Sequence, residues 1–256
     1  MSLSKNKIKQ IQSLNNKKHR LAHGTFVAEG TKLVFDLLAT CRCQFVAALP
    51  EVLAEHREIV ADEMVVADAN ELKKATFLKT PPPIIAVFYQ PQHDISSINF
   101  DKKLTLILDG IQDPGNVGTI VRTADWFGIE HIICSPDTAD IYNPKTVQAT
   151  MGAIARVKVH YTNLSDFLQQ HNHLPIYGTA LDGKNIYTEQ LAENGFIVMG
   201  SEGSGIRPDV IQTINHKLFI PNFPFDRETS ESLNVGVAAG IICGEFRRRR
   251  FDSLES

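Results

Sequence analysis

Residues 104–122 read LTLILDGIQDPGNVGTIVR, and this stretch decides the fold that the sequence predicts. Its first six residues, Leu104–Asp109, form a short apolar run that ends in an acid, as expected for a buried strand. A loop with Gly and Pro follows, and the apolar residues from Val117 onward have helical spacing. The stretch therefore predicts a strand, a tight loop and a helix, with Asn116 well placed as the helix N-cap.

The same alternation of strand and helix continues on both sides of this unit. Further strands are expected at residues 44–49, 64–66, 84–89, 131–134, 157–161, 176–181, 196–200 and 217–220. Helices are expected at 4–14, 30–40, 52–59 and after Asp68, with helical patterns between most of the later strands. This order predicts an α/β fold with a largely parallel sheet that is covered on both faces. Ligands of such sheets bind at the carboxyl ends of the strands.

Residues 91–103 are polar and show no sustained period, so this segment is the best candidate for a linker. We therefore predict a small α/β domain at 1–90, a linker at 91–103 and a larger domain at 104–256. A chain of 256 residues is long enough for two such domains.

The composition describes a globular protein with a core, since 43% of the residues are hydrophobic and 21% are charged. No apolar run approaches the roughly 20 residues of a membrane helix, and the Lys-rich start lacks the apolar region of a secretory signal. The cysteines lack metal-site or disulfide spacing, so we expect free, mostly buried thiols in a reducing cytoplasm and no metal site. These cysteines are Cys41, Cys43, Cys134 and Cys243.

The net charge of −3 hides cationic ends on an anionic body. Residues 1–28 contain six basic residues and no acid, and residues 247–250 are four arginines followed by two acids. Removing these 10 basic and 2 acidic residues from the totals of 26 and 29 leaves 16 against 27. This asymmetry suits a polyanionic partner that is met at particular surfaces, although solvated ends on an ordinary enzyme would look the same.

Two later segments also follow strands and have unusual composition. Residues 200–205 read GSEGSG, a turn in which glycines let backbone groups approach a ligand closely. Its glycine order differs from that of the dinucleotide fingerprint, and no acid lies about twenty residues later. Residues 232–235 read SLNV in front of the small-residue helix GVAAG, which either packs tightly or offers its first amides to a ligand.

In order and spacing, residues 116–122, 200–205 and 232–235 resemble motifs 1, 2 and 3 of the SpoU/TrmH family of RNA ribose methyltransferases. Each motif alone is weak, but the three together are specific. The N-terminal part is similar to the substrate-binding domain of many members, so the resemblance covers nearly the whole chain. It implies a Rossmann-like domain with a parallel sheet and a deep C-terminal trefoil knot, preceded by a small α/β RNA-binding domain.

The resemblance also implies the reaction, which is methyl transfer from S-adenosylmethionine to a ribose 2′-hydroxyl of RNA by a cytoplasmic homodimer with active sites near its interface. Arg122 would stabilise the developing oxyanion, and four residues would position the reacting groups: Asn116, Glu202, Ser232 and Asn234. The implied cofactor contacts are Thr179, Ala180, Gly200, Ser201, Glu202, Ile220 and Leu233. The expected RNA contacts are Lys17, Lys18, Arg20 and Arg122.

The chain departs from the family pattern at three places. Asn222 follows Pro221 where members usually have Met, and residues 223–231 form a stretch about four residues longer than usual. Gln148 and Thr150 stand where Arg and Ser are common. The first two departures affect how the loop covers the cofactor, and the third affects an RNA contact.

Ribosomal RNA is the favoured substrate, because members with this N-terminal domain often act there; a tRNA 2′-O-methyltransferase is the alternative. An RNA-binding protein that kept the fold without catalysis is a second class. A small-molecule enzyme that uses another nucleotide is a third, although the dinucleotide fingerprint is missing.

Overall fold

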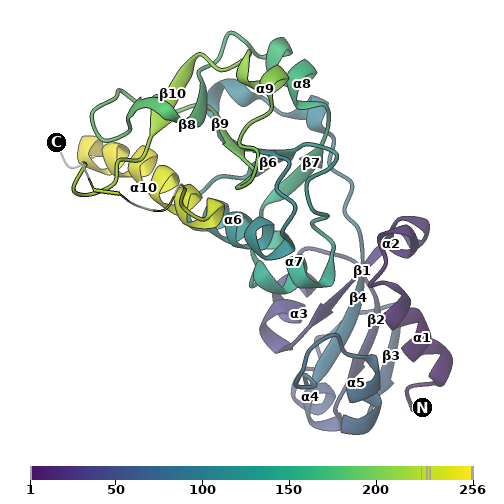
Figure 1. Ribbon diagram of the computed structural model, residues 1–256. Coiled ribbons are helices and arrows are strands. Elements are labelled where there is room, and N and C mark those ends of the chain that lie inside the picture. Colours follow the sequence, from purple (N-terminus) through teal and green to yellow (C-terminus); the bar gives the residue numbers. More distant parts are fainter. Residues whose placement is uncertain (1, 226, 229, 231, 255–256) are drawn as a thin grey trace. The chain divides into compact units, whose positions relative to one another are not determined.

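The computed structural model describes residues 2–225, 227, 228, 230 and 232–254 (Figure 1). The chain divides into two compact units. Unit 1 comprises residues 1–92 and 140–156, and unit 2 comprises residues 93–139 and 157–256. Among the described residues, no helix is both long and apolar enough to cross a membrane.

Unit 1 is built on a mixed four-stranded sheet with the strand order β1-β4-β2-β3. β4 is antiparallel to β1 and β2, whereas β2 and β3 are parallel. Its elements are α1 (Lys5–Ser13), α2 (Lys17–His23), β1 (Thr25–Glu29), α3 (Thr31–Leu38), β2 (Cys43–Ala48), α4 (Pro50–Glu55), β3 (Glu63–Val66), α5 (Ala69–Ala75), β4 (Ile84–Tyr89), α7 (Pro144–Ala149) and η3 (Ala153–Ala155). The sequence missed β1, α2 and α7, and it placed the other strands of this unit within one residue.

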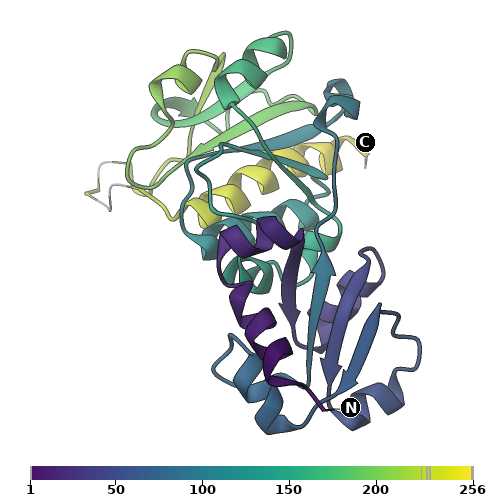
Figure 2. The ribbon, with the colours of Figure 1, turned by 90° about the vertical axis from the view of Figure 1, so that its right-hand side faces the viewer.

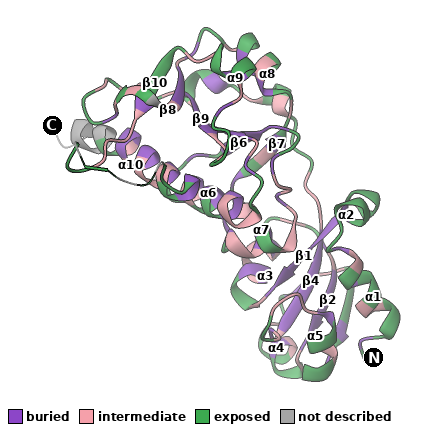
Figure 3. Cartoon of the chain, in the orientation of Figure 1, coloured by how far each residue is buried: buried purple, intermediate pink, exposed green. Residues whose placement is uncertain are grey.

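Strands β1, β2 and β4 of unit 1 are buried on both faces, because alternate strand residues enter two separate cores. Phe26, Val46 and Phe88 pack with α3 and α4 on one face. Phe45 and Val87 pack with α1 and α5 on the other. The purple strands in Figure 3 show this burial. Burial on both faces explains why these strands are continuous apolar runs.

Polar side chains fix where the helices of unit 1 begin. Ser4 and Asn16 accept hydrogen bonds from the first turns of α1 and α2. Asp68 and Glu71 form a capping box at α5, which confirms the helix expected after Asp68.

Unit 2 is built on a six-stranded sheet whose strands are all parallel, in the order β10-β8-β9-β5-β6-β7. Figures 1 and 2 show α6 and α10 on one face of this sheet and α8 and α9 on the other. Its elements are η1 (Ile95–Ser97), η2 (Phe100–Lys102), β5 (Leu104–Asp109), α6 (Pro114–Trp126), β6 (His131–Cys134), β7 (Lys158–Tyr161), α8 (Leu164–Gln170), β8 (Ile176–Asn185), β9 (Gly195–Gly200), α9 (Pro208–Ile211), β10 (His216–Phe219) and α10 (Val235–Leu254). The expected largely parallel sheet is confirmed for this unit.

The segment expected as a linker contributes to the core of unit 2. Residues 95–97 and 100–102 form short 3-10 helices, and Phe100 is only 3% exposed. Its ring packs against Phe167 and Phe196 at centroid distances of 5.4 and 5.5 Å. A single aromatic residue in a polar stretch has no periodicity, so sequence patterns do not reveal its burial.

All four cysteines are free, as expected, and three of them are buried. Burial raises the pKa of the thiols of Cys43 and Cys243 to about 12, so they stay protonated at neutral pH.

Candidate active site

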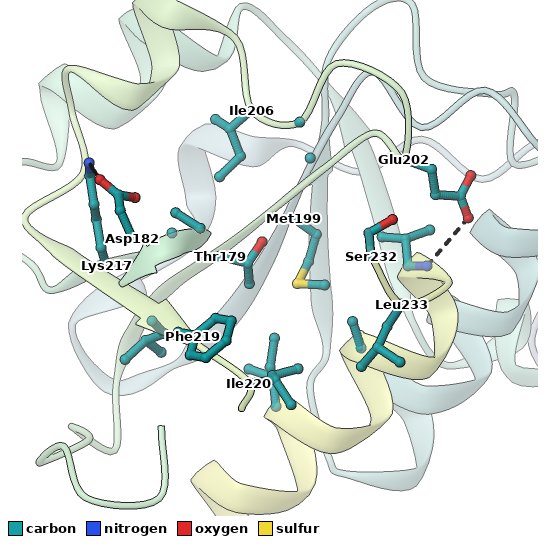
Figure 4. A pocket seen from close by; sticks show the side chains of 18 of the residues that line it. Thr179, Asp182, Met199, Glu202, Ile206, Lys217, Phe219, Ile220, Ser232 and Leu233 are labelled. Atoms are coloured by element: carbon teal, nitrogen blue, oxygen red, sulfur yellow. Dashed lines mark hydrogen bonds and ion pairs between the residues drawn. The ribbon is translucent and has the colours of Figure 1, made fainter. Parts of the chain in front are cut away.

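The carboxyl ends of β8, β9 and β10 open into one cavity of about 820 Å³ at the start of α10 (Figure 4). Its wall is largely apolar, with contributions from Met199, Ile206 and Leu218. Polar groups lie on two opposite sides of the cavity. Glu202 and Ser232 lie near the start of α10, and the ion pair of Asp182 and Lys217 lies across the cavity, with Nζ and Oδ2 2.6 Å apart. The volume suits a cofactor-sized ligand, for which typical pockets measure about 300–1,000 Å³.

The glycine-rich loop after β9 is a tight turn that only small residues allow. Ser201 and Gly205 exchange backbone hydrogen bonds of 2.9 and 3.0 Å. A Cβ on Gly200 would lie 2.2 Å from the carbonyl carbon of Gly205, so a side chain at Gly200 would displace the loop. The turn brings Glu202 to the rim of the cavity.

The start of α10 is fixed by Asn234. Its Oδ1 accepts from the amides of Gly236 and Val237 at 3.0 and 3.3 Å, which is the geometry of an N-cap. Residues 232–235 are therefore a capped helix start, and Leu233 and Ser232 next to it line the cavity.

The expectation that Asn116 is the N-cap of α6 is wrong. Asp113 is the cap and accepts from the amide of Asn116 at 3.0 Å, and Pro114 occupies the first helical turn. A cap by Asp113 leaves the Asn116 side chain free to bind elsewhere. The sequence signal was ambiguous, because both residues are good N-caps and lie three positions apart.

The three motifs meet in one hydrogen-bonded cluster around Glu202. The Glu202 Oε1 atom accepts from Asn116 Nδ2 at 2.8 Å, Asn234 Nδ2 at 2.9 Å and the amide of Val235 at 3.3 Å. Asn234 Nδ2 also donates to Asn116 Oδ1 at 3.0 Å. The carboxylate thus sits at the N-terminus of α10, where the helix dipole favours negative charge. Because three chain segments converge on one oxygen, each of them fixes the position of the other two.

Sequence reasoning missed a second polar contact that holds the same loop. Asp109, buried at the end of β5, accepts from the backbone amide of Arg207 at 2.8 Å and from its Nε at 2.7 Å. The hydrogen bond to Asp109 raises the pKa of the Arg207 guanidinium above its usual value. It ties the end of β5 to the end of the glycine-rich loop. The available signal was an acid that ends an apolar strand.

The structure brings together most of the predicted site residues. The seven expected cofactor contacts and Ser232 all line the cavity, and Asn116 and Asn234 contact Glu202 directly. Arg122 is different. It is exposed on α6, does not line the cavity, and has no hydrogen bond or ion pair within the described part of the chain.

The expectation that Arg20 contacts RNA is not supported by its position. Arg20 is 1% exposed, and its guanidinium donates to Asp140 at 2.7 and 3.0 Å and to the carbonyls of Leu14 and Asn15 at 2.8 Å. A buried cation needs such partners, and here they consume its donors. Lys17 and Lys18, by contrast, are exposed at the start of α2.

Two of the four arginines at positions 247–250 make contacts within the protein. Arg247 donates to the carbonyls of Phe127 and Gly128 at 2.7 and 3.2 Å, and Arg248 pairs with Glu245. The side chains of Arg249 and Arg250 lie outside the described residues, as do Asp226, Thr229 and Glu231 of the long loop.

Comparison with known proteins gives one consistent pattern. A model described as the SpoU rRNA Methylase family matches residues 103–244, and one described as an MRM3-like substrate binding domain matches residues 5–86. The Bacillus subtilis protein named 23S rRNA (guanosine(2553)-2′-O)-methyltransferase RlmP is 28% identical and covers 96% of this chain and 98% of its own length. RlmB of Neisseria meningitidis is 36% identical over 57% of this chain and 59% of its own.

Solved structures agree over the whole length. A TrmH-family protein from Porphyromonas gingivalis is 40% identical with a TM-score of 0.86, covering 96% of this chain and 99% of that one. An rRNA methyltransferase from Sinorhizobium meliloti, solved with AdoMet bound, is 28% identical with a TM-score of 0.85 and covers 97% of both chains.

Proposed function

The chain belongs to the SpoU rRNA methylase family, and from that membership and its site we infer that it methylates a ribose 2′-hydroxyl of ribosomal RNA. S-adenosylmethionine is the methyl donor. The observation that carries this function is the cluster in which Asn116, Glu202 and Asn234 join three distant motifs at one cavity.

The cavity residues fit this cofactor. Its volume of about 820 Å³ and its apolar wall suit an adenosine-sized group, and the strand ends around it present backbone amides and carbonyls. We propose that it is held by Thr179 and Ala180 in β8, by residues 200–202 at the end of β9 and just after it, by Ile220 after β10, and by Leu233. When bound, S-adenosylmethionine supplies an electrophilic methyl group on a sulfonium.

The chain's own residues must make a poor nucleophile reactive, because a ribose hydroxyl attacks only as its proton is withdrawn or its oxyanion is stabilised. We propose that Arg122 stabilises that oxyanion, since a guanidinium with a pKa above about 12 is a donor and not a base. Asn116, Glu202, Ser232 and Asn234 hold the loop and the start of α10, and so align the acceptor oxygen at the cavity mouth.

The position of Arg122 outside the cavity of its own chain supports a shared site. We propose a homodimer in which Arg122 of one protomer completes the site of its partner. Mixing Arg122→Ala with Glu202→Gln should then restore part of the activity that each variant lacks alone, because one site of the mixed dimer is intact. If the mixture is as inactive as its components, the shared site is wrong.

We propose the domain limits 1–90 for substrate binding, 91–103 for the connection and 104–256 for methyl transfer. The family models at 5–86 and 103–244 support these limits, although residues 140–156 pack with unit 1. We also propose that the C-terminal part forms a deep trefoil knot. The return of α10 from the edge strand β10 to pack on α6 supports this. A cytoplasmic location is proposed because the substrate is made there.

The function is tested with radiolabelled S-adenosylmethionine and RNA from cells that lack the gene. Purified protein should label 23S ribosomal RNA at one nucleotide and leave tRNA unlabelled. Label on tRNA alone would favour the tRNA enzyme. Cofactor binding by calorimetry without methyl transfer to either RNA would favour a protein that lost catalysis.

A further inference from the structure

The lysines and arginines of residues 1–92 fall into two groups. One group is neutralised by acids: Lys7 pairs with Glu63, Lys32 with Asp36, Arg42 with Asp62 and Arg20 with Asp140. The other group has no ion pair within the described part of the chain and is exposed. It comprises Lys5, Lys9, Lys17, Lys18, Arg57, Lys73, Lys74 and Lys79.

Members of the second group from distant parts of the sequence lie on two helices that pack together. α1 packs against α5, and the Gln12 side-chain amide of α1 donates to the carbonyl of Lys74 at 2.6 Å. Lys9 lies one turn before Gln12 on the same face of α1. Lys73 and Lys74 end α5 and are exposed, because Leu72 and Ala75 on either side are buried in the core. Figure 3 shows the outer faces of both helices exposed.

We propose that Lys9, Lys73 and Lys74, here called the α1–α5 surface, bind the phosphate backbone of the RNA substrate. The proposal rests on the proposed function, which makes RNA the partner. Neighbouring cations without counterions raise the local potential, and a polyanion neutralises them by releasing its own counterions. The surface contacts phosphates, so it contributes affinity and orientation without reading sequence.

Nearby acids do not cancel this charge. α1 contains no acidic residue, and Glu63 is held by Lys7. The Glu71 carboxylate binds the backbone amide of Asp68 at the opposite end of α5. Two more exposed lysines, Lys17 and Lys18, begin α2 after the three residues that follow α1.

A purely structural role explains only part of this arrangement. Lysines in the last turn of a helix interact favourably with the helix dipole, which accounts for Lys73 and Lys74. It does not account for Lys9, which lies in the middle of α1. A dipole role would also leave the salt dependence of RNA binding unchanged.

The test compares two triple variants with equal loss of charge. The first is Lys9→Gln/Lys73→Gln/Lys74→Gln. The control is Lys32→Gln/Arg42→Gln/Lys103→Gln, in which each cation is paired with an acid. The probe is protein-free 23S ribosomal RNA from cells that lack the gene, and filter binding is measured over a range of KCl concentrations.

The first variant should make the negative slope of log Kobs against log [KCl] shallower by about 2–3, since each of the three lost phosphate contacts removes about 0.7–0.9 from its magnitude. Its KM for RNA should rise at least about tenfold, with kcat and cofactor affinity unchanged. The control should keep the wild-type slope. An unchanged slope in the first variant, or an equal fall in both, would overturn the proposal. The slope measures binding alone, so it decides this point even if the wild-type protein failed to methylate the RNA.

Discussion

At the scale of single residues, the site depends on which atom of each side chain faces Glu202. Asn234 uses its oxygen to cap α10 and its nitrogen to donate to Glu202 and Asn116. An amide is the only common side chain of this size that accepts on one side and donates on the other. Asn234 therefore joins helix initiation to the geometry of the site.

We expect Asn234→Asp to preserve the N-cap of α10 but to lower the methyltransferase activity. A carboxylate caps as well as an amide, but it would face the Glu202 carboxylate, which now accepts at 2.9 Å. kcat/KM should fall at least about tenfold, while circular dichroism shows an intact fold. Asn163→Asp, the same change at the cap of α8, is the control and should retain activity. Full activity of Asn234→Asp would refute the donor role.

Arg20 illustrates the opposite case, a charged residue whose role is structural. Arg20→Ala should lower the free energy of unfolding by about 3–5 kcal/mol, because it leaves the Asp140 carboxylate, 14% exposed, without its partner. Lys17→Ala, three residues earlier and exposed, should stay within about 0.5 kcal/mol. Urea unfolding measures both. Equal effects of the two changes would contradict the assignment.

At the scale of elements, α10 packs on α6, and its glycines at positions 236, 240 and 244 differ in how close their neighbours lie. A Cβ on Gly236 would lie 3.1 Å from Thr119 Cγ2, and one on Gly244 would lie 3.5 Å from the Phe127 ring. A Cβ on Gly240 would meet nothing within 4 Å. The start of α10 therefore lies so close to α6 that it needs a glycine, whereas the middle of α10 has room for a side chain.

We expect Gly240→Ala to stabilise the protein by about 0.5–1 kcal/mol, because alanine loses less backbone entropy in a helix and here meets no obstacle. Gly236→Ala should not stabilise the protein and should lower its activity, since Thr119 or the start of α10 must move. Thermal unfolding and methyl transfer measure the two effects. A destabilised Gly240→Ala would show that the glycine stripe is needed along its whole length.

At the scale of the whole molecule, a buried histidine pair links the stability of unit 2 to pH. His131 Nδ1 and His160 Nε2 lie 3.3 Å apart, on adjacent strands β6 and β7. Desolvation first, then His160, and then the cations Lys103 and Lys158 lower the pKa of His131 to about 4, while Glu130 opposes this. Desolvation and the nearby His93 also lower the pKa of His160.

Both folded-state pKa values lie below the unfolded value of about 6.5, so the unfolded chain binds more protons as the pH falls. The contribution of this pair to the free energy of unfolding should therefore be complete above pH 6.5. It should decline towards pH 4, by up to about 1.4 kcal/mol per pH unit for each proton. Urea unfolding between pH 4.5 and 7.5 measures this slope. His131→Gln should flatten it, whereas His173→Gln, at an exposed side chain, should not. An unchanged slope in His131→Gln would remove the pair as its cause.

The sequence by itself determined every strand except β1, the parallel α/β class of unit 2 and the identity of the site segments. These depend on local patterns, namely apolar runs, caps and short motifs such as residues 232–235. The family resemblance also pointed to seven expected cofactor contacts, and all seven line one cavity. The failures of the sequence-based predictions at single polar residues share one cause, because each concerns a residue whose partner is distant in the chain.

Only the tertiary structure decided that Asp113 and not Asn116 caps α6, because the competing partner of Asn116 is Glu202, 86 residues away. It likewise buried Arg20 against Asp140, 120 residues away. The same folding packed α1, which carries Lys9, against α5, which carries Lys74. Local patterns set which backbone conformation a segment prefers, whereas the bond that a polar side chain makes depends on which segments folding brings within about 3 Å of it.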